Sequence, residues 1–105
     1  MVVDDGVNQS TALVGMVVTS RAGRDAGDRY VVVGAAGHDM VLVADGRRRQ
    51  VSRPKRKNIK HLVVHGPAGH LAGRLRDGQA VTDEELRAIL GAEAPERRSG
   101  AGMGA

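Results

Sequence analysis

The chain has 105 residues and a formal net charge of +4 at pH 7, which is enough for one small domain. It contains no Cys, Phe or Trp and a single Tyr, which excludes disulfides and thiolate metal sites and predicts an aliphatic core. No apolar run reaches the roughly 20 residues that span a bilayer, so we expect a cytoplasmic protein without a membrane partner.

The positive charge is concentrated in the middle of the chain. Residues 15–65 carry eleven Lys or Arg against four Asp, whereas residues 66–105 carry five basic and six acidic residues. Eight of the basic residues lie within residues 47–60, a stretch that contains no Asp or Glu. Because like charges at this density repel one another, the pattern favours a surface that meets phosphate over a loop that only serves solubility.

The first part of the chain predicts a leader followed by a β-hairpin. Residues 1–12 contain few apolar side chains and are expected to be flexible. Residues 14–20 and 29–34 are two Val-rich segments with the composition of strands. The turn between them contains Gly23 and Gly27, which can adopt the positive φ angles of a tight loop.

Three further strands are expected before residue 65. Residues 40–44 predict a third strand, and Asp45-Gly46 is a dipeptide favoured in two-residue hairpin turns. A fourth strand is expected at residues 48–52, where Pro54 ends it, and a last strand at residues 59–64. Five short strands with tight turns indicate a mainly β fold, a small SH3-like barrel that occupies residues 13–65.

The C-terminal part predicts a linker and a short helix over residues 66–91. Thr82 and Glu85 have the spacing of a capping box, and Gly91 is expected to end the helix. Its apolar face consists of Leu86, Ile89 and Leu90. A helix of this length is not stable alone, so this face should pack on the barrel or on a partner. Residues 92–105 are expected to be disordered.

The order of these features resembles the KOW motif of ribosomal and transcription-factor proteins. Gly15, Gly23 and Gly27, with the valines around them, stand where that motif has its glycines and strand residues. The later sequences VLVADG and VSRPKRKNIKHL are similar to those of eukaryotic-type large-subunit ribosomal protein fourteen and its small bacterial KOW-domain relatives. The chain departs from the motif at Ala26 and Asp28, where basic residues are common.

This resemblance covers about half of the chain. It implies a KOW-type SH3-like barrel that binds structured RNA, in this case ribosomal RNA, and associates with the ribosome or the translation machinery. Ribosomal proteins are further partners that it implies.

The candidate RNA contacts are basic side chains of the KOW-like part. They are Arg21, Arg24, Arg48, Arg53, Lys55, Arg56, Lys57, Lys60 and His61. Arg21 and Arg24, which lie in the Gly turn, are secondary contacts. Arg suits this task because its planar guanidinium can contact phosphate through two hydrogen bonds. Tyr30 is the only aromatic residue, so stacking of single-stranded bases in the manner of RRM or OB-fold proteins is not expected.

Other kinds of site find little support in the sequence. His61, His65 and His70 are not spaced to lie on one face of a strand or helix, so we expect neither a metal nor a cofactor. Gly23–Gly27 lacks the Lys-Ser/Thr pair of a P-loop, and no nucleophile stands beside a base, so we do not expect an enzyme. The alternative to RNA binding is a protein-interaction module that docks on ribosomal or transcription proteins.

Overall fold

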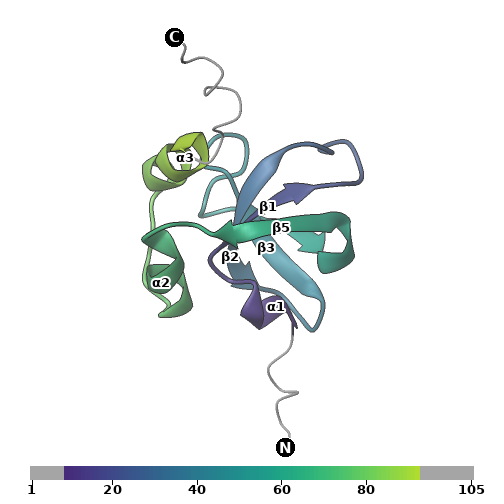
Figure 1. The fold of residues 1–105 in the computed structure, drawn as a ribbon, viewed down its shortest axis with the longest axis horizontal. Helices are drawn as coiled ribbons and strands as arrows, with labels where there is room; N and C mark the ends of the chain where they lie inside the picture. Colours follow the sequence, from purple (N-terminus) through teal and green to yellow (C-terminus); the bar gives the residue numbers. More distant parts are fainter. Residues whose placement is uncertain (1–8, 93–105) are drawn as a thin grey trace, which may run out of the picture.

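Five antiparallel strands form one sheet in the computed structural model of the protein, which describes residues 9–92 (Figure 1). The strands are β1 (Met16–Ser20), β2 (Arg29–Ala35), β3 (Met40–Ala44), β4 (Lys55–Asn58) and β5 (Leu62–Pro67). Their order in the sheet is β4-β3-β2-β1-β5. The mainly β fold is therefore confirmed, but the sheet is not closed into a barrel, because among the described residues no ladder joins β4 to β5.

The two edge strands nevertheless converge at one end of the sheet. A single 3₁₀ turn, η2 (Ile59–His61), leads from β4 directly into β5. Such a connection spans at most about 14 Å, so the sheet must curl until its edges approach each other at this end. Asn58 caps the turn by accepting a hydrogen bond from the Lys60 N–H at 2.9 Å.

The first three predicted strands are confirmed, and the fourth was placed wrongly. The fifth, expected at residues 59–64, begins only at Leu62, because Ile59–His61 forms the 3₁₀ turn. We expected the fourth at residues 48–52, but β4 begins at Lys55, directly after Pro54. The Asp45 carboxylate accepts the N–H groups of Arg47 and Arg49 at 2.8 and 3.0 Å, and this closes a loop in place of a two-residue turn. Pro54 costs the sheet no hydrogen bond because it lies just outside an edge strand.

Both faces of the sheet are covered, and each has its own apolar cluster, because successive strand residues point to opposite faces. The outer face packs against α2 (Leu71–Arg76) and α3 (Asp83–Ala92), which lie along one side of the sheet in Figure 1. Its buried residues are Val17, Val31, Ala44, Ala68, Leu71, Leu75, Val81 and Leu86. The inner, concave face buries Val18, Tyr30, Val32, Val41, Val43 and Leu62.

The capping box of α3 is confirmed. The Thr82 N–H donates to Glu85 Oε1 at 2.9 Å, and the Glu85 N–H donates to Thr82 Oγ1 at 3.1 Å. Hydrogen bonds from Arg74 and from the Thr82 backbone lower the pKa of Glu85 to about 2. Leu86 is 0 % exposed in the outer cluster, so the apolar face of α3 packs on the protein's own sheet. Gly91 does not end the helix, which continues to Ala92.

The segment expected as a leader contains one ordered turn. Residues Gln9–Ala12 form α1, and the buried Ser10 hydroxyl donates a hydrogen bond to the Gly37 carbonyl oxygen. The tail was expected to be disordered from residue 92, but Ala92 belongs to α3. The expectation of flexibility for the rest of the leader, and that of disorder for the rest of the tail, fall on residues outside 9–92. Within the described range, no helix is long and apolar enough to cross a membrane.

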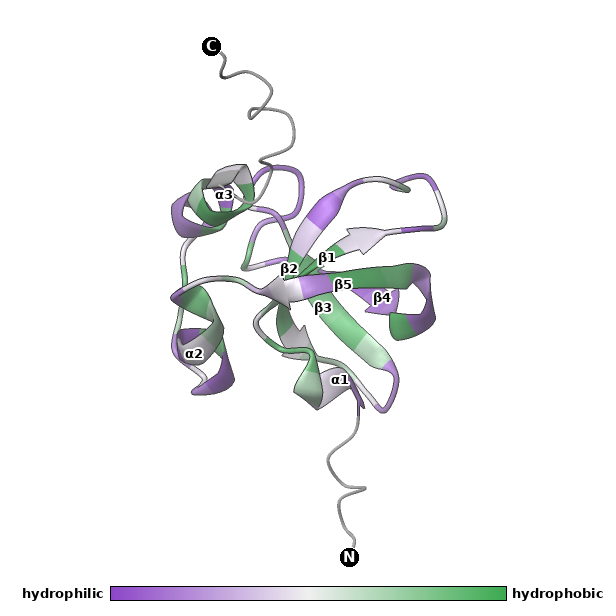
Figure 2. Cartoon of the chain, in the orientation of Figure 1, coloured by the Kyte–Doolittle hydropathy of each residue, from purple (hydrophilic) through white to green (hydrophobic). Residues whose placement is uncertain are grey.

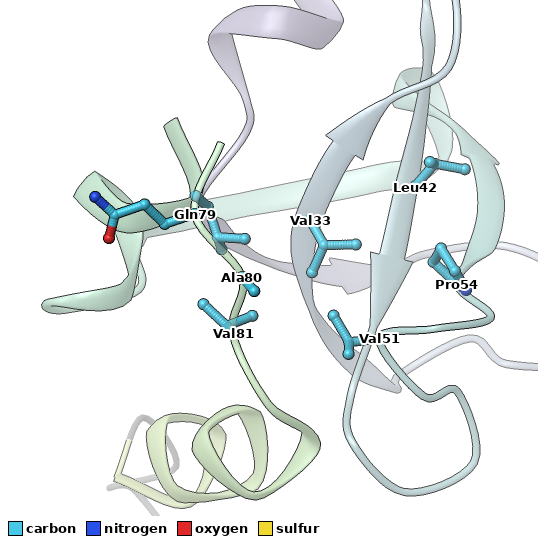
Figure 3. Close-up of a pocket in the computed structure, with 8 residues that line it drawn as sticks. Val33, Leu42, Val51, Pro54, Gln79, Ala80 and Val81 are labelled. Atoms are coloured by element: carbon cyan, nitrogen blue, oxygen red, sulfur yellow. The ribbon is translucent and has the colours of Figure 1, made fainter. Parts of the chain in front are cut away.

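A groove of about 340 Å³ lies between the outer face of the sheet and the segment that joins α2 to α3 (Figure 3). It is lined by Val33, Leu42, Val51, Pro54, Leu75, Gln79, Ala80 and Val81. The Gln79 side chain extends away from the valines in the close-up. The groove therefore has an apolar lining without the convergent polar groups that would orient a small substrate.

Truncation of Leu86 tests the packing of α3 on the sheet. Leu86→Ala should lower the free energy of unfolding by about 2–5 kcal/mol, because it opens a cavity in the outer cluster. Urea unfolding followed by circular dichroism would measure this change. Val63→Ala, at a residue that is 43 % exposed, is the control and should cost well under half as much. Equal, small effects at both positions would show that α3 is not docked.

Candidate nucleic-acid interface

A buried carboxylate in the turn between β1 and β2 lies at the centre of the basic region. Asp25 is 8 % exposed and accepts four side-chain hydrogen bonds. Its Oδ1 accepts from Ser20 Oγ and Lys57 Nζ, both at 2.9 Å. Its Oδ2 accepts from Tyr30 Oη at 2.8 Å and from Lys55 Nζ at 3.0 Å. We call these five residues the Asp25 network.

Strand register explains how two lysines reach a carboxylate thirty or more positions earlier in the chain. Lys55 pairs with Val43 and Lys57 with Val41 across the β3–β4 ladder. Paired residues share a face, so both lysines point to the inner face with the valines, while Arg56 points to the outer face. The turn that carries Asp25 covers the inner face at this edge, where the three charges meet.

The charges of the network determine its protonation state. Burial alone would raise the pKa of Asp25, but the hydrogen bonds from Lys57, Tyr30, Lys55 and Ser20 outweigh it and hold the pKa well below its usual range. Burial and the Asp25 carboxylate together raise the pKa of Tyr30 above its usual range. Asp25 is therefore ionised and Tyr30 protonated at neutral pH.

Two of the expected RNA contacts belong to this network. The Lys57 side chain is 10 % exposed, and its ammonium donates to Asp25 and to the Ala22 carbonyl oxygen at 3.2 Å. The Lys55 side chain is 31 % exposed and is paired with Asp25 at 3.0 Å. A phosphate contact by Lys57 would require this ion pair to break, so the structure gives Lys57 a role in holding the fold together.

Four other expected contacts remain exposed and make no ion pair within residues 9–92. They are Arg21, Arg24, Arg56 and Lys60, and we call them the basic surface. Arg24 directly precedes Asp25, and the Arg21 N–H donates to the His61 carbonyl oxygen at 2.8 Å. The Asp25 network and the Arg21–His61 hydrogen bond join the β1–β2 turn to β4 and η2, the elements that carry Arg56 and Lys60.

The last three expected contacts have less favourable positions. Arg48 approaches Asp28 at 3.7 Å with 84 % of its side chain exposed, so this pair adds little stability. Arg53 is exposed in the loop before Pro54, outside the network. His61 is half-buried, and its backbone rather than its ring makes the described contact with Arg21.

Three glycines in and just before the β1–β2 hairpin have two different functions. Gly15, Gly23 and Gly27 all have positive φ angles, of 92°, 86° and 95°. A Cβ at Gly15 would lie 2.9 Å from the backbone of Ala72, so this glycine lets α2 approach the sheet. Gly27 shapes the turn itself and donates its N–H to the Ser20 carbonyl oxygen at 2.7 Å.

No family model matches the chain, and no curated protein matches it either. Within residues 9–92, no three His, Cys, Asp or Glu side chains gather as they would around a metal ion. The candidate interface is therefore defined only by the contacts within this chain.

The sequence interpretation did not assign Asp25 and Ser20 to the site. The signal that could have identified Asp25 is the period of two in Lys55 and Lys57, which matches Val41 and Val43 once β4 is paired with β3 in register.

The Asp25 network should make the protein sensitive to acid. Asp25 has a lowered pKa, so its contribution is complete above the unfolded-state value of about 3.9 and is lost as pH falls toward the folded-state value. At pH 7 the Asp25→Asn variant should be less stable than the parent protein. This difference should shrink below about pH 4. Urea unfolding at a series of pH values measures it, and a difference that is constant from pH 7 to pH 3 would contradict the assignment.

Proposed function

We propose that this protein binds structured RNA without catalysing a reaction, and that the basic surface contacts the phosphate backbone. The observation that carries the proposal is the Asp25 network, which joins the β1–β2 turn to β4. By neutralising its own carboxylate with Lys55 and Lys57, the network leaves Arg21, Arg24 and Arg56 without an acidic partner within residues 9–92. Exposed, uncompensated cations are the usual means of binding phosphate.

We further propose that the open sheet is a KOW-type SH3-like fold. Two features support this: each neighbouring pair of strands is antiparallel, and the chain from β1 to β4 passes through the sheet in sequence order before β5 returns beside β1. The short η2 link brings the two edges together as in a partly closed barrel. With the resemblance to the KOW family, this makes ribosomal RNA the proposed target and the translation machinery the proposed setting.

The mode of binding follows from the chemistry of the side chains. Tyr30 is the only aromatic residue in the sequence, it is 4 % exposed, and its hydroxyl is bonded to Asp25. Stacking of bases on exposed aromatic rings, which single-strand binders use, is therefore not available. The proposed mode is recognition of backbone and groove shape in folded RNA by Arg and Lys.

We propose a non-catalytic function because the buried carboxylate is not suited to proton transfer. Asp25, the buried acid of residues 9–92, is held ionised by four donors. A general acid or base needs a pKa close to the working pH, and Asp25 is far from it.

The alternative function is protein docking through the apolar face of α3. The packing of this face on the protein's own sheet argues against it. Leu86, at the centre of the expected contact face, is 0 % exposed, and Ile89 and Leu90 pack against the same outer cluster. A pulldown from cell extract would separate the two functions. Recovery of ribosomal proteins that RNase treatment abolishes supports RNA binding, and recovery that survives RNase supports protein docking.

The basic surface should determine the salt dependence of binding. Arg21→Ala with Arg24→Ala should weaken binding to a folded ribosomal RNA fragment and reduce the slope of log K against log salt by about 1.5, the release expected for two phosphates. Fluorescence anisotropy at several salt concentrations would measure both quantities.

The matched control is Arg97→Ala with Arg98→Ala, which removes the same charge from the sequence outside residues 9–92. It should change the slope little. Equal losses for the two double variants would mean that net charge, rather than the basic surface, attracts the RNA. A slope near zero for the parent protein would contradict phosphate contact altogether.

A further inference from the structure

Strand β5 exposes apolar side chains at an open edge of the sheet. Val63 and Val64 are 43 % and 44 % exposed, and they are the large apolar residues exposed within residues 9–92. Val63 pairs with Thr19, whose side chain is on the outer face, and Val64 pairs with Val18, which is on the inner face. Both faces of β5 therefore present a valine, and β1 is its neighbour on one side only.

The two edges of this sheet differ in their protection against pairing with another strand. Edge strands usually carry charges that prevent association with other chains. β4 has such charges in Lys55, Arg56 and Lys57, whereas β5, with the sequence LVVHGP, has no Lys, Arg, Asp or Glu. Figure 2 shows the contrast, with β4 in purple and the first part of β5 in green. β5 is therefore the edge that can accept a further strand.

We infer that β5 pairs with the β5 strand of a second copy of this chain. In an antiparallel arrangement centred on Val63, each Val63 faces Val63 of the second copy, and each Leu62 faces its Val64. This register places three apolar pairs side by side and continues the sheet across a two-fold axis.

Pairing between two β5 strands is more favourable than pairing between two β4 strands. A strand without charged residues can approach its own copy without repulsion, whereas two β4 strands would bring two exposed Arg56 side chains together. His65, the next residue in β5, is bonded to Thr19 of β1 at 2.6 Å, so its ring is held over its own sheet.

The interface would be small. Three residue pairs bury far less than the roughly 1,600 Å² of a standard stable interface, so the dimer should be weak, reversible and dependent on concentration. This inference rests on β5 alone and is independent of RNA binding.

Sedimentation of the full chain, freed of nucleic acid, tests the inference between about 10 μM and about 1 mM protein. The mean mass of the parent protein should rise toward that of a dimer across this range. Val63→Lys places a charge at the centre of the pairing and should weaken association at least tenfold while leaving the melting temperature nearly unchanged. Hydrogen exchange of the β5 amides should slow as the parent protein becomes more concentrated.

Ser52→Lys is the matched control, because it adds the same charge at an exposed loop residue outside β5. It should associate as the parent protein does. A parent protein that stays monomeric at the highest concentration overturns the inference. A Val63→Lys variant that dimerises like the parent overturns it too, because the contact would then lie elsewhere.

Discussion

The ion pair between Asp25 and Lys57 is the interaction on which the basic half of the molecule depends. A carboxylate that is 8 % exposed is costly to bury, and its cost is offset only when several donors share its charge. Lys57, Lys55, Tyr30 and Ser20 together supply those donors from three strands. The β1–β2 turn is thereby tied to β4, which is otherwise an edge strand bonded only to β3.

The ion pairs with Asp25 also divide the basic residues of β4 into two groups. In the run Lys55-Arg56-Lys57, the two lysines point inward and hold the fold, while the arginine between them points outward and is exposed. The exposed cations at the turn and at η2 are positioned by the same contacts. A charge-rich segment can therefore stabilise a small aliphatic domain and still present a positive surface.

The sequence predicts part of this arrangement. Strands rich in Val were predictable because their alternation and composition are local properties. The fourth strand was not, since residues 48–52 also resemble a strand, and the hydrogen bonds of the Asp45 side chain decide in favour of a loop. The cations of the site were identified, but charge alone cannot tell an inward lysine from an outward one. That distinction depends on the register between β4 and β3, which is a tertiary property.

The most direct test of this account is a double-mutant cycle between Asp25 and Lys57. The free energy of unfolding would be measured for Asp25→Asn, Lys57→Met and the double variant at pH 7. Each single change should destabilise the protein by about 2–4 kcal/mol, and the double change should cost at least about 1.5 kcal/mol less than their sum. Single effects that add to within about 0.5 kcal/mol would contradict the account, because Asp25 would then not depend on Lys57.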